Sequence, residues 1–332
     1  MIGFCCKFLQ DDGKPDPRYV TRGTTLTWLQ SHSEQHQFEK MEEIVRHNLD
    51  ATLALVKHLG NQPMVERIVR LSSDILPFFS HPHTSKFYQY FEHEIEKKLY
   101  EIGNAARYDK VRLSFHPGQF VVLGSDQPEV VDNSIREIEA HATIAKMMGY
   151  EGVGNSNPYG FHINIHPSGV GGIPAISESF RRLTLNARNL VTFENDEFSY
   201  GLDDCLVLSM LTEAPVVLDI HHHWIFSKGE HISINDPRVE KVHDSWKRRK
   251  PIMHYSLSKE SLIPNYPRDV LPDYDTYVKA GYGPGKLRAH SDYYWNNAAN
   301  QWVASFLGNF DIEAEVKMKN LAVSDLRHKL SF

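Results

Sequence analysis

The stretch RLSFHPGQFV (residues 112–121) contains the unit whose repetition decides the fold. It begins as a short apolar, β-forming segment that ends at His116, and Pro117-Gly118 then turn the chain. The chain contains eight predicted strands of this kind: IGFCC (2–6), IVRLSS (68–73), VRLSFHP (111–117), FHINIHP (161–167), LVTFEND (190–196), PVVLDIH (215–221), PIMHYSL (251–257) and FDIEAEVK (310–317).

Helical segments are predicted between these strands. Within residues 34–59 and again within 135–148, apolar residues recur at helical spacing, which indicates one buried helix face. Weaker helices are predicted at 86–106, 175–189, 201–213 and 296–307. Eight strands that alternate with helices predict a parallel sheet, and the number eight favours a closed (β/α)8 TIM barrel over an open sheet. Because no GxGxxG motif follows a strand, we expect no nucleotide cofactor.

The length of 332 residues fits a single barrel domain over residues 1–332, with its active site at the C-terminal mouth of the strands. Residues 257–295 are rich in Pro, Gly and Tyr and predict a long active-site loop. No apolar run approaches the roughly 18 residues that span a bilayer, so no membrane partner is expected. Three cysteines make no disulfide framework, which fits a reducing compartment. We expect a cytoplasmic monomer, associated with the nucleoid if the source is bacterial.

The net charge of −6, from 36 basic and 42 acidic residues, argues mildly against a nucleic-acid partner. Two features weaken that argument. The stretch WKRRK (246–250) is a local basic cluster, and acidic residues that bind divalent cations would be neutralised. The 19 histidines favour a metal site.

Six successive predicted strands end in a residue that can bind a metal ion. These residues are His116, His166, Glu194, Asp219, His254 and Glu315. The C-terminal ends of barrel strands converge on one mouth, so we expect these distant residues to be neighbours. His222 follows closely after the sixth strand, and the 257–295 loop adds His290 and Asp292. Burying so many ionisable groups together is costly unless cations bind them.

Taken singly, each of these residues has a simpler interpretation. A lone His beside Pro is more often part of a turn, and a lone carboxylate at a strand end usually caps a helix or forms an ion pair. Six coincident strand ends argue against that interpretation. A mixed imidazole and carboxylate set suits zinc, manganese or iron, and eight or nine ligands predict two or three ions. Clustered divalent ions indicate hydrolysis of a phosphoester.

The chain resembles the UV damage endonucleases, metal-dependent (β/α)8 repair enzymes related to apurinic-site endonucleases of the endonuclease IV type. The resemblance is carried, in order, by RLSSDILPFFSH (70–81), FHPGQFVVLGS (115–125), IHPSG (165–169), LVTFENDE (190–197), PVVLDIHHH (215–223), MHYSLS (253–258), AHSDYYW (289–295) and EAEVKMKN (313–320). It implies a DNA repair endonuclease that nicks damaged double-stranded DNA immediately 5′ to UV photoproducts, with abasic sites as a further substrate. A metal-activated water would leave a 3′-hydroxyl and a 5′-phosphate.

The resemblance also implies three metal sites that share carboxylates, with Glu194, Glu315 and Asp219 as the catalytic carboxylates. The first site would be held by His116, His166, Glu194 and Glu315. The second would share Glu194 and Glu315 and add Asp219 and His254. The third would be held by His222, His290 and Asp292. Manganese is the ion expected first, with zinc or magnesium as alternatives.

Gln119 and Phe120 follow His-Pro-Gly, and the resemblance implies that they enter the DNA at the lesion. Phe120 stands where the family more often has tyrosine, and Ile252 stands where it commonly has a lysine. The alternative for Phe120 is a core aromatic, because the residues after it are apolar. Further candidate DNA contacts are Arg70, Ser72 and Lys317.

Three other functions remain open at this point. Two are enzymes on the same barrel, namely an apurinic-site endonuclease and a two-metal sugar isomerase. The third is a catalytically silent barrel that binds damaged DNA. An isomerase would need a closed, substrate-sized pocket, whereas a silent barrel would lack a ligand.

Overall fold

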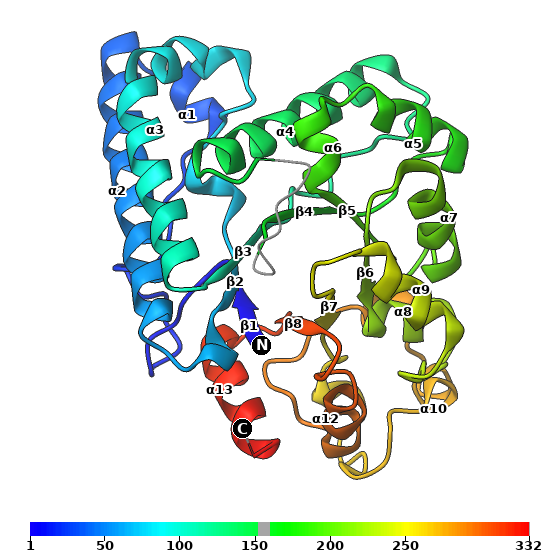
Figure 1. Ribbon diagram of the computed structural model, residues 1–332. Helices are drawn as coiled ribbons and strands as arrows, with labels where there is room; N and C mark the ends of the chain where they lie inside the picture. The colour runs from blue at the N-terminus through cyan, green and yellow to red at the C-terminus, as the bar shows by residue number, and fades with distance from the viewer. Residues whose placement is uncertain (152–159, 332) are drawn as a thin grey trace.

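The strands of the protein form a closed parallel barrel in the computed structural model, which describes residues 1–151 and 160–331 (Figure 1). Neighbouring strands pair in sequence order from β1 to β8, and β8 pairs with β1 to close the barrel. The strands are β1 Ile2–Cys5, β2 Ile68–Arg70, β3 Arg112–Phe115, β4 His162–Ile165, β5 Val191–Glu194, β6 Val216–Asp219, β7 Ile252–Tyr255 and β8 Asp311–Ala314. Each lies within a predicted segment, and the (β/α)8 prediction is confirmed.

Helices surround the barrel, and the two longest, α2 and α3, lie side by side (Figure 1). The α-helices of the described residues are α1 Leu26–Gln30, α2 Glu34–Gly60, α3 Ser85–Tyr108, α4 Pro128–Met147, α5 Gly172–Arg181, α6 Leu185–Leu190, α7 Leu202–Thr212, α8 Ile220–Phe226, α9 Pro237–Ser245, α10 Tyr274–Lys279, α11 Pro284–Leu287, α12 Asn297–Ala304 and α13 Lys319–Lys329. The single helix predicted at 175–189 is instead two helices. Thr184 separates them, because its hydroxyl accepts a hydrogen bond from Ala187 N (3.2 Å) and starts α6 as an N-cap.

Side chains alternate along each strand between the helical layer and the barrel interior. On β5, Phe193 packs against Phe180 of α5, with ring centroids 5.6 Å apart. The preceding residue, Thr192, instead donates a hydrogen bond to Asn164 Oδ1 of β4 (2.9 Å). Polar contacts also cross the interior between strands that are not neighbours, such as His254 of β7 with Glu194 of β5. The barrel interior near the C-terminal ends of the strands is therefore polar, and the candidate site lies there.

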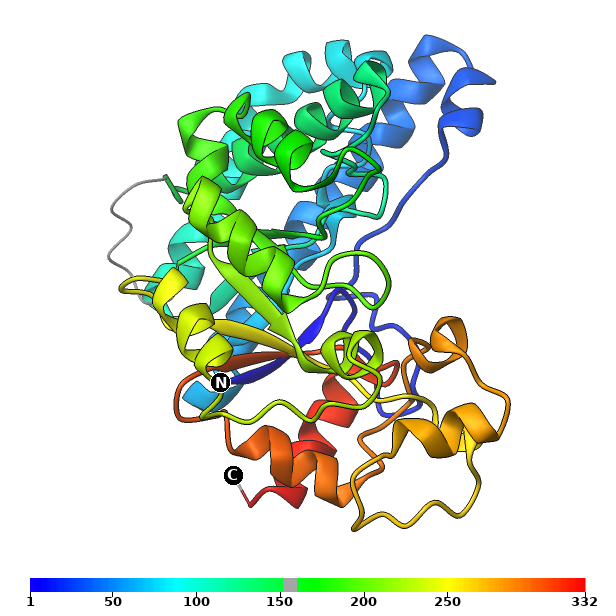
Figure 2. The ribbon, with the colours of Figure 1, turned by 90° about the vertical axis from the view of Figure 1, so that its right-hand side faces the viewer.

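The segment 257–295 is not a structureless loop. It contains the 3-10 helix η4 (Glu260–Leu262) and helices α10 and α11. Tyr274 and Tyr277 pack edge-on against Trp224 of α8 and form a small apolar cluster of their own. Figure 2 shows this segment (gold to orange) and the segment around α1 (blue) on opposite sides of the end of the barrel toward which the strands point.

The basic stretch 246–250 lies at the other end of the barrel. Trp246 Nε1 donates to the carbonyl of Val216, the first residue of β6, and Lys250 Nζ pairs with Asp311, the first residue of β8 (3.1 Å). Ile252, where the resemblance would place a lysine, is buried in an apolar cluster there. Because residues 246–250 lie at the end of the barrel opposite the mouth, they do not contribute basic residues to a DNA-binding surface at the mouth.

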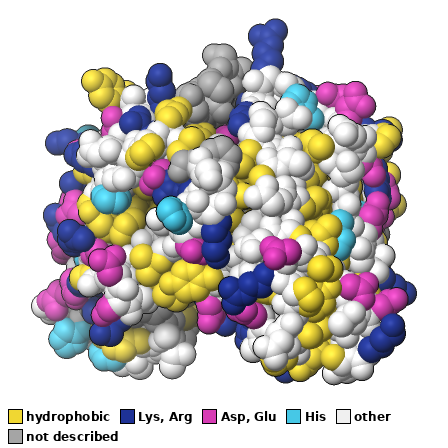
Figure 3. Space-filling model, turned by 90° about the horizontal axis from the view of Figure 1, so that it is seen from below, with side chains coloured by type: hydrophobic (Ala, Val, Ile, Leu, Met, Phe, Trp, Pro, Cys, Tyr) yellow, Lys and Arg dark blue, Asp and Glu magenta, His cyan; other side chains and the backbone are white. Residues whose placement is uncertain are grey.

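Charged side chains of both signs are interspersed over the face seen from the α12 and α13 side (Figure 3). That face carries no large area of a single sign, in keeping with a net charge of only −6. Within residues 1–151 and 160–331, no helix combines the length and the apolar character needed to cross a membrane.

Candidate metal centre

The residues predicted from the strand ends meet at the mouth of the barrel. Two groups of side chains have donor atoms within 4.8 Å of one another: His116, His166 and Glu194 form the first, and Glu194, Asp219, His254 and Glu315 form the second. The four members of the second group are all buried. Barrel closure therefore brings together residues from six different strands, as the sequence predicted for these positions.

Glu194 is the residue that the two groups share. Its Oε1 lies 2.9 Å from His254 Nδ1, and its Oε2 lies 3.1 Å from His116 Nε2. His166 Nε2 is 3.6 Å from the same Oε2. Each carboxylate oxygen thus faces a different set of imidazoles, so Glu194 could serve as a ligand in both groups.

His222 and His290 lie at the edge of this cluster. Asp219 is the N-cap of α8, and its Oδ1 accepts a hydrogen bond from His222 N (2.7 Å). This cap explains why His222 follows Asp219 by three residues. It places His222 Nδ1 3.7 Å from Glu194 Oε1. His290 Nε2 is 3.9 Å from Glu315 Oε2.

Asp292 is not brought into the cluster. Its side chain is 67% exposed, and it pairs with Lys317 Nζ at 3.1 Å on the rim. Glu197, which we had not predicted, lies closer to the edge of the cluster. It is buried, and its Oε2 lies 3.7 Å from His222 Nε2. Glu197 follows Glu194 by three residues, but no local periodicity marks it as a site residue.

The pKa values show how strongly these groups interact. Burial raises the pKa of Asp219 to about 7 and lowers that of His166 to about 4. Burial would lower the pKa of His222, but the charges of Asp219 and Glu194 raise it to about 9. Burial also opposes the ionisation of Glu194, yet His254 and His166 hold the pKa of its carboxyl well below its usual range. Protons and positive charge therefore balance buried carboxylates at this site, and cations can replace them.

The residues present fit divalent cations. The set consists of imidazoles and carboxylates, without thiolates, which suits manganese, zinc or magnesium. Asp219 Oδ2 and His166 Nδ1 are buried and have no hydrogen-bond partner within residues 1–151 and 160–331. A buried, unpartnered acceptor in a ring of other ligand atoms is costly unless an ion or water satisfies it.

Two interior residues that support the ligands were not predicted. Asn164 Nδ2 donates a hydrogen bond to Glu194 Oε2. Glu313 Oε2 lies 3.2 Å from His254 Nε2, so the carboxylate can hold the imidazole with Nδ1 toward Glu194. Both were detectable in principle. Asn164 precedes His166 by two residues and Glu313 precedes Glu315 by two, so each lies on the same interior face as the ligand that follows it.

The exposed turn after β3 carries the predicted lesion contacts. Gln119 and Phe120 are both exposed, after a buried Pro117, and the side chain of Phe120 is 83% exposed. The interpretation of Phe120 as a core aromatic is therefore wrong. Among the described residues, Phe120 is not a member of the hydrophobic core cluster.

The predicted basic and hydroxyl contacts are placed differently. Arg70 is only 12% exposed and forms an ion pair with Glu315, so it belongs to the metal centre and is not free for phosphates. Ser72 starts η2 (Ser73–Ile75), because its Oγ accepts from Asp74 N (3.2 Å). Lys317 remains half-exposed on the rim, paired with an acid.

Comparison with known proteins agrees with this geometry. The family model described as UV-endonuclease UvdE matches residues 1–332. The UV DNA damage endonuclease of Bacillus cereus (strain ATCC 10987 / NRS 248) is 25% identical over 319 residues, which cover 92% of this chain and 88% of that protein. The crystal structure of SacUVDE superposes with a TM-score of 0.75 at 25% identity, covering 99% of this chain and 98% of that one. Endonuclease IV from Thermus thermophilus shares the fold, with a TM-score of 0.51 at 12% identity over 84% of this chain and 94% of that one. The match over its whole length shows that this chain belongs to the UV-endonuclease UvdE family.

Proposed function

We propose that this protein nicks damaged double-stranded DNA immediately 5′ to UV photoproducts and leaves a 3′-hydroxyl and a 5′-phosphate. Membership of the UV-endonuclease family makes it a DNA repair endonuclease that acts on UV damage, and the position and chemistry of the nick are the proposal. The observation that supports it most is the pair of ligand groups that share Glu194 at the mouth of the barrel. Such a paired arrangement is suited to hydrolysing a phosphodiester.

We expect two or three divalent cations per chain, with manganese first. Bound at this site, they would activate water at neutral pH and stabilise charge on the phosphate. Glu194 would contribute to both ligand groups, and Glu315 would complete the second with Asp219 and His254. Arg70 keeps Glu315 ionised, because its positive charge opposes the effect of burial on the pKa of that carboxyl. Asn164 and Glu313 orient Glu194 and its histidine partner, so the ligands need little rearrangement.

Gln119 and Phe120 are proposed to enter the duplex at the lesion. An aromatic residue that is 83% exposed offers a ring face that can stack on bases. Insertion requires unstacking, which costs least where the bases are already distorted, so the same step favours damaged sites. Abasic sites offer a similar opening and are proposed as a further substrate.

A nicking assay tests this function directly. Duplexes that carry one UV photoproduct, one abasic site or no damage are labelled at the 5′ end of the damaged strand and incubated with manganese. We expect a single product that ends immediately 5′ to the photoproduct and can be extended by a polymerase, which requires a 3′-hydroxyl. Cleavage at abasic sites alone would indicate an apurinic-site endonuclease, and binding without any cleavage would indicate a silent barrel.

Glu194→Gln is the matched variant for the metal centre. Glutamine keeps the size of the side chain but removes the charge that the two ligand groups share. We expect nicking to be abolished, while the circular dichroism spectrum and most of the DNA affinity are retained. A Glu194→Gln protein that nicks at the wild-type rate would contradict the proposed role.

A further inference from the structure

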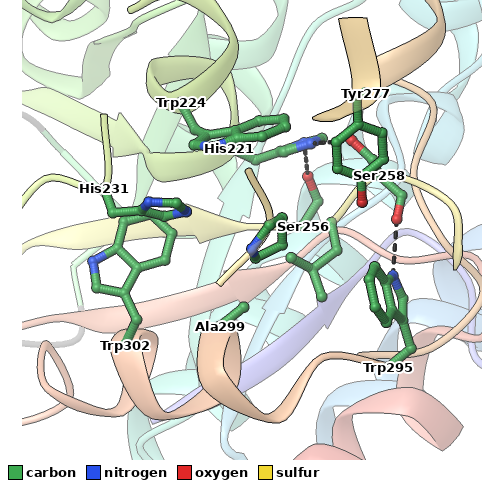
Figure 4. Close-up of a pocket in the computed structure, with 11 residues that line it drawn as sticks. His221, Trp224, His231, Ser256, Ser258, Tyr277, Trp295, Ala299 and Trp302 are labelled. Atoms are coloured by element: carbon green, nitrogen blue, oxygen red, sulfur yellow. Dashed lines mark hydrogen bonds between the residues drawn. The ribbon is translucent and has the colours of Figure 1, made fainter. Parts of the chain in front are cut away.

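A small pocket lies next to the candidate metal centre, between α8, the exit of β7, α12 and the segment 257–295. Its volume of about 20 Å³ suits a single water and no larger ligand. His221 and His231 line it together with Trp224 and Trp302 (Figure 4). His221 is the chain neighbour of His222, so the polar contacts of this space bear on the metal centre.

His221 is held by two serines from the exit of β7. Its Nδ1 lies 2.8 Å from Ser256 Oγ, and its Nε2 lies 3.0 Å from Ser258 Oγ. Ser258 Oγ in turn donates a hydrogen bond to the carbonyl of Leu287 (2.7 Å). Figure 4 shows the imidazole reaching both serines from α8. The three links form one continuous chain from α8 to the last residue of α11.

For a neutral imidazole, the donors and acceptors of this chain can be arranged in only one way. The Ser258 hydroxyl has a single hydrogen, which it gives to Leu287 O, so it must accept from His221 Nε2–H. Nδ1 of the neutral imidazole therefore carries no hydrogen and accepts from Ser256 Oγ–H. The serines fix both the tautomer and the ring orientation.

The same chain fixes the backbone that carries His290. Leu287 precedes His290 by three residues, and Ser258 pairs with His290 in an antiparallel bridge. Ser291 N also donates to Leu257 O (2.8 Å). His290 is thereby tied to the exit of β7, and His221 ties that exit to the helix that carries His222.

We propose that His221 is a positioning residue that holds residues 287–291 over the metal centre, so that His290 faces the cluster beside His222. The role in metal binding rests on the proposed function, whereas the tether itself rests on the contacts above. If His221 acted only through packing, its replacement by phenylalanine would leave the protein unchanged. His221 stacks on Trp224 at 5.9 Å, and a phenylalanine would keep that stacking while losing both hydrogen bonds.

The test compares His221→Phe with His231→Phe. His231 lines the same space and packs edge-on against Trp302 (5.0 Å), but it lies outside the chain to Leu287. Ser258→Ala breaks the chain without replacing either histidine. The first measurement is amide hydrogen exchange over residues 284–292 in metal-free protein. The second is a manganese titration followed by electron paramagnetic resonance.

We expect His221→Phe and Ser258→Ala to speed exchange over residues 284–292 and to weaken the most weakly bound manganese by ~10–100-fold, the usual effect of losing a partner behind the ligands. The tighter manganese ions and the His231→Phe protein should behave as wild type. Wild-type exchange in both chain variants, or equal effects of the two His→Phe changes, would overturn the proposal. If His221→Phe does not fold, Ser258→Ala decides. A wild-type protein that nicks no substrate would refute the proposed function, while the exchange result would still decide the tether.

Discussion

Replacing Phe120 by alanine separates lesion recognition from folding. The side chain is 83% exposed on the turn after β3 and belongs to no part of the core. Its removal leaves no cavity, so the free energy of unfolding should change by no more than about 0.5 kcal/mol. If the ring stacks on DNA bases, its loss should cost ~1–3 kcal/mol of binding free energy. That corresponds to roughly 5- to 150-fold weaker binding of the lesion, since 1.4 kcal/mol is about tenfold.

Binding is best measured in a Glu194→Gln background, where the DNA should stay intact, by fluorescence anisotropy on matched UV-damaged and undamaged duplexes. The affinity for damaged DNA should fall, and that for undamaged DNA should change little, because stacked bases leave no site for the ring. Phe120→Tyr keeps the aromatic face and should bind as wild type. Tyr108→Ala is the control, because Tyr108 is 88% exposed at the end of α3, away from the mouth.

Two outcomes would refute this reasoning. One is a Phe120→Ala protein that binds and nicks UV-damaged DNA as well as wild type. The other is an equal loss of affinity for damaged and undamaged DNA, which would make Phe120 a general contact and not a lesion probe. A large loss of thermal stability would instead show that the ring packs against the protein in solution.

Two further predictions concern the metal centre. Glu313→Gln should weaken manganese binding by ~10–100-fold, because it removes the carboxylate charge that lies 3.2 Å from His254 Nε2, and a titration that matches wild type would exclude this role. Manganese affinity should also rise with pH between pH 6 and 9, by up to about tenfold per unit for each proton displaced, because ions must displace protons from Asp219 (pKa about 7) and His222 (pKa about 9). These raised pKa values stabilise the metal-free fold at low pH and lose that effect as pH rises through 7 and 9, so the metal-free protein should become less stable over this range. Calorimetry in buffers of different ionisation enthalpy, with parallel thermal melts, would detect both effects, and a pH-independent affinity would contradict them.

Most of the barrel could be predicted because its signals are local. The apolar segments and the helical spacing in residues 34–59 each report on a few neighbouring residues, and β1 to β8 all appear where expected. The failures are also local. One predicted helix is broken at an N-cap by Thr184, and the short helices of the segment 257–295 are stabilised by packing against Trp224, which sequence spacing does not show.

The sequence by itself determined which side chains are offered at the mouth. A histidine or carboxylate at six successive strand ends, together with the period of two along a strand, is enough to assemble the centre once the barrel closes. Only the tertiary structure decided the roles of the remaining residues. Arg70 forms an ion pair with Glu315, Asp292 pairs with Lys317 on the rim, and Phe120 is exposed. The physical reason is that these outcomes depend on which distant groups meet across the barrel and how far each is removed from water, and no local pattern specifies either.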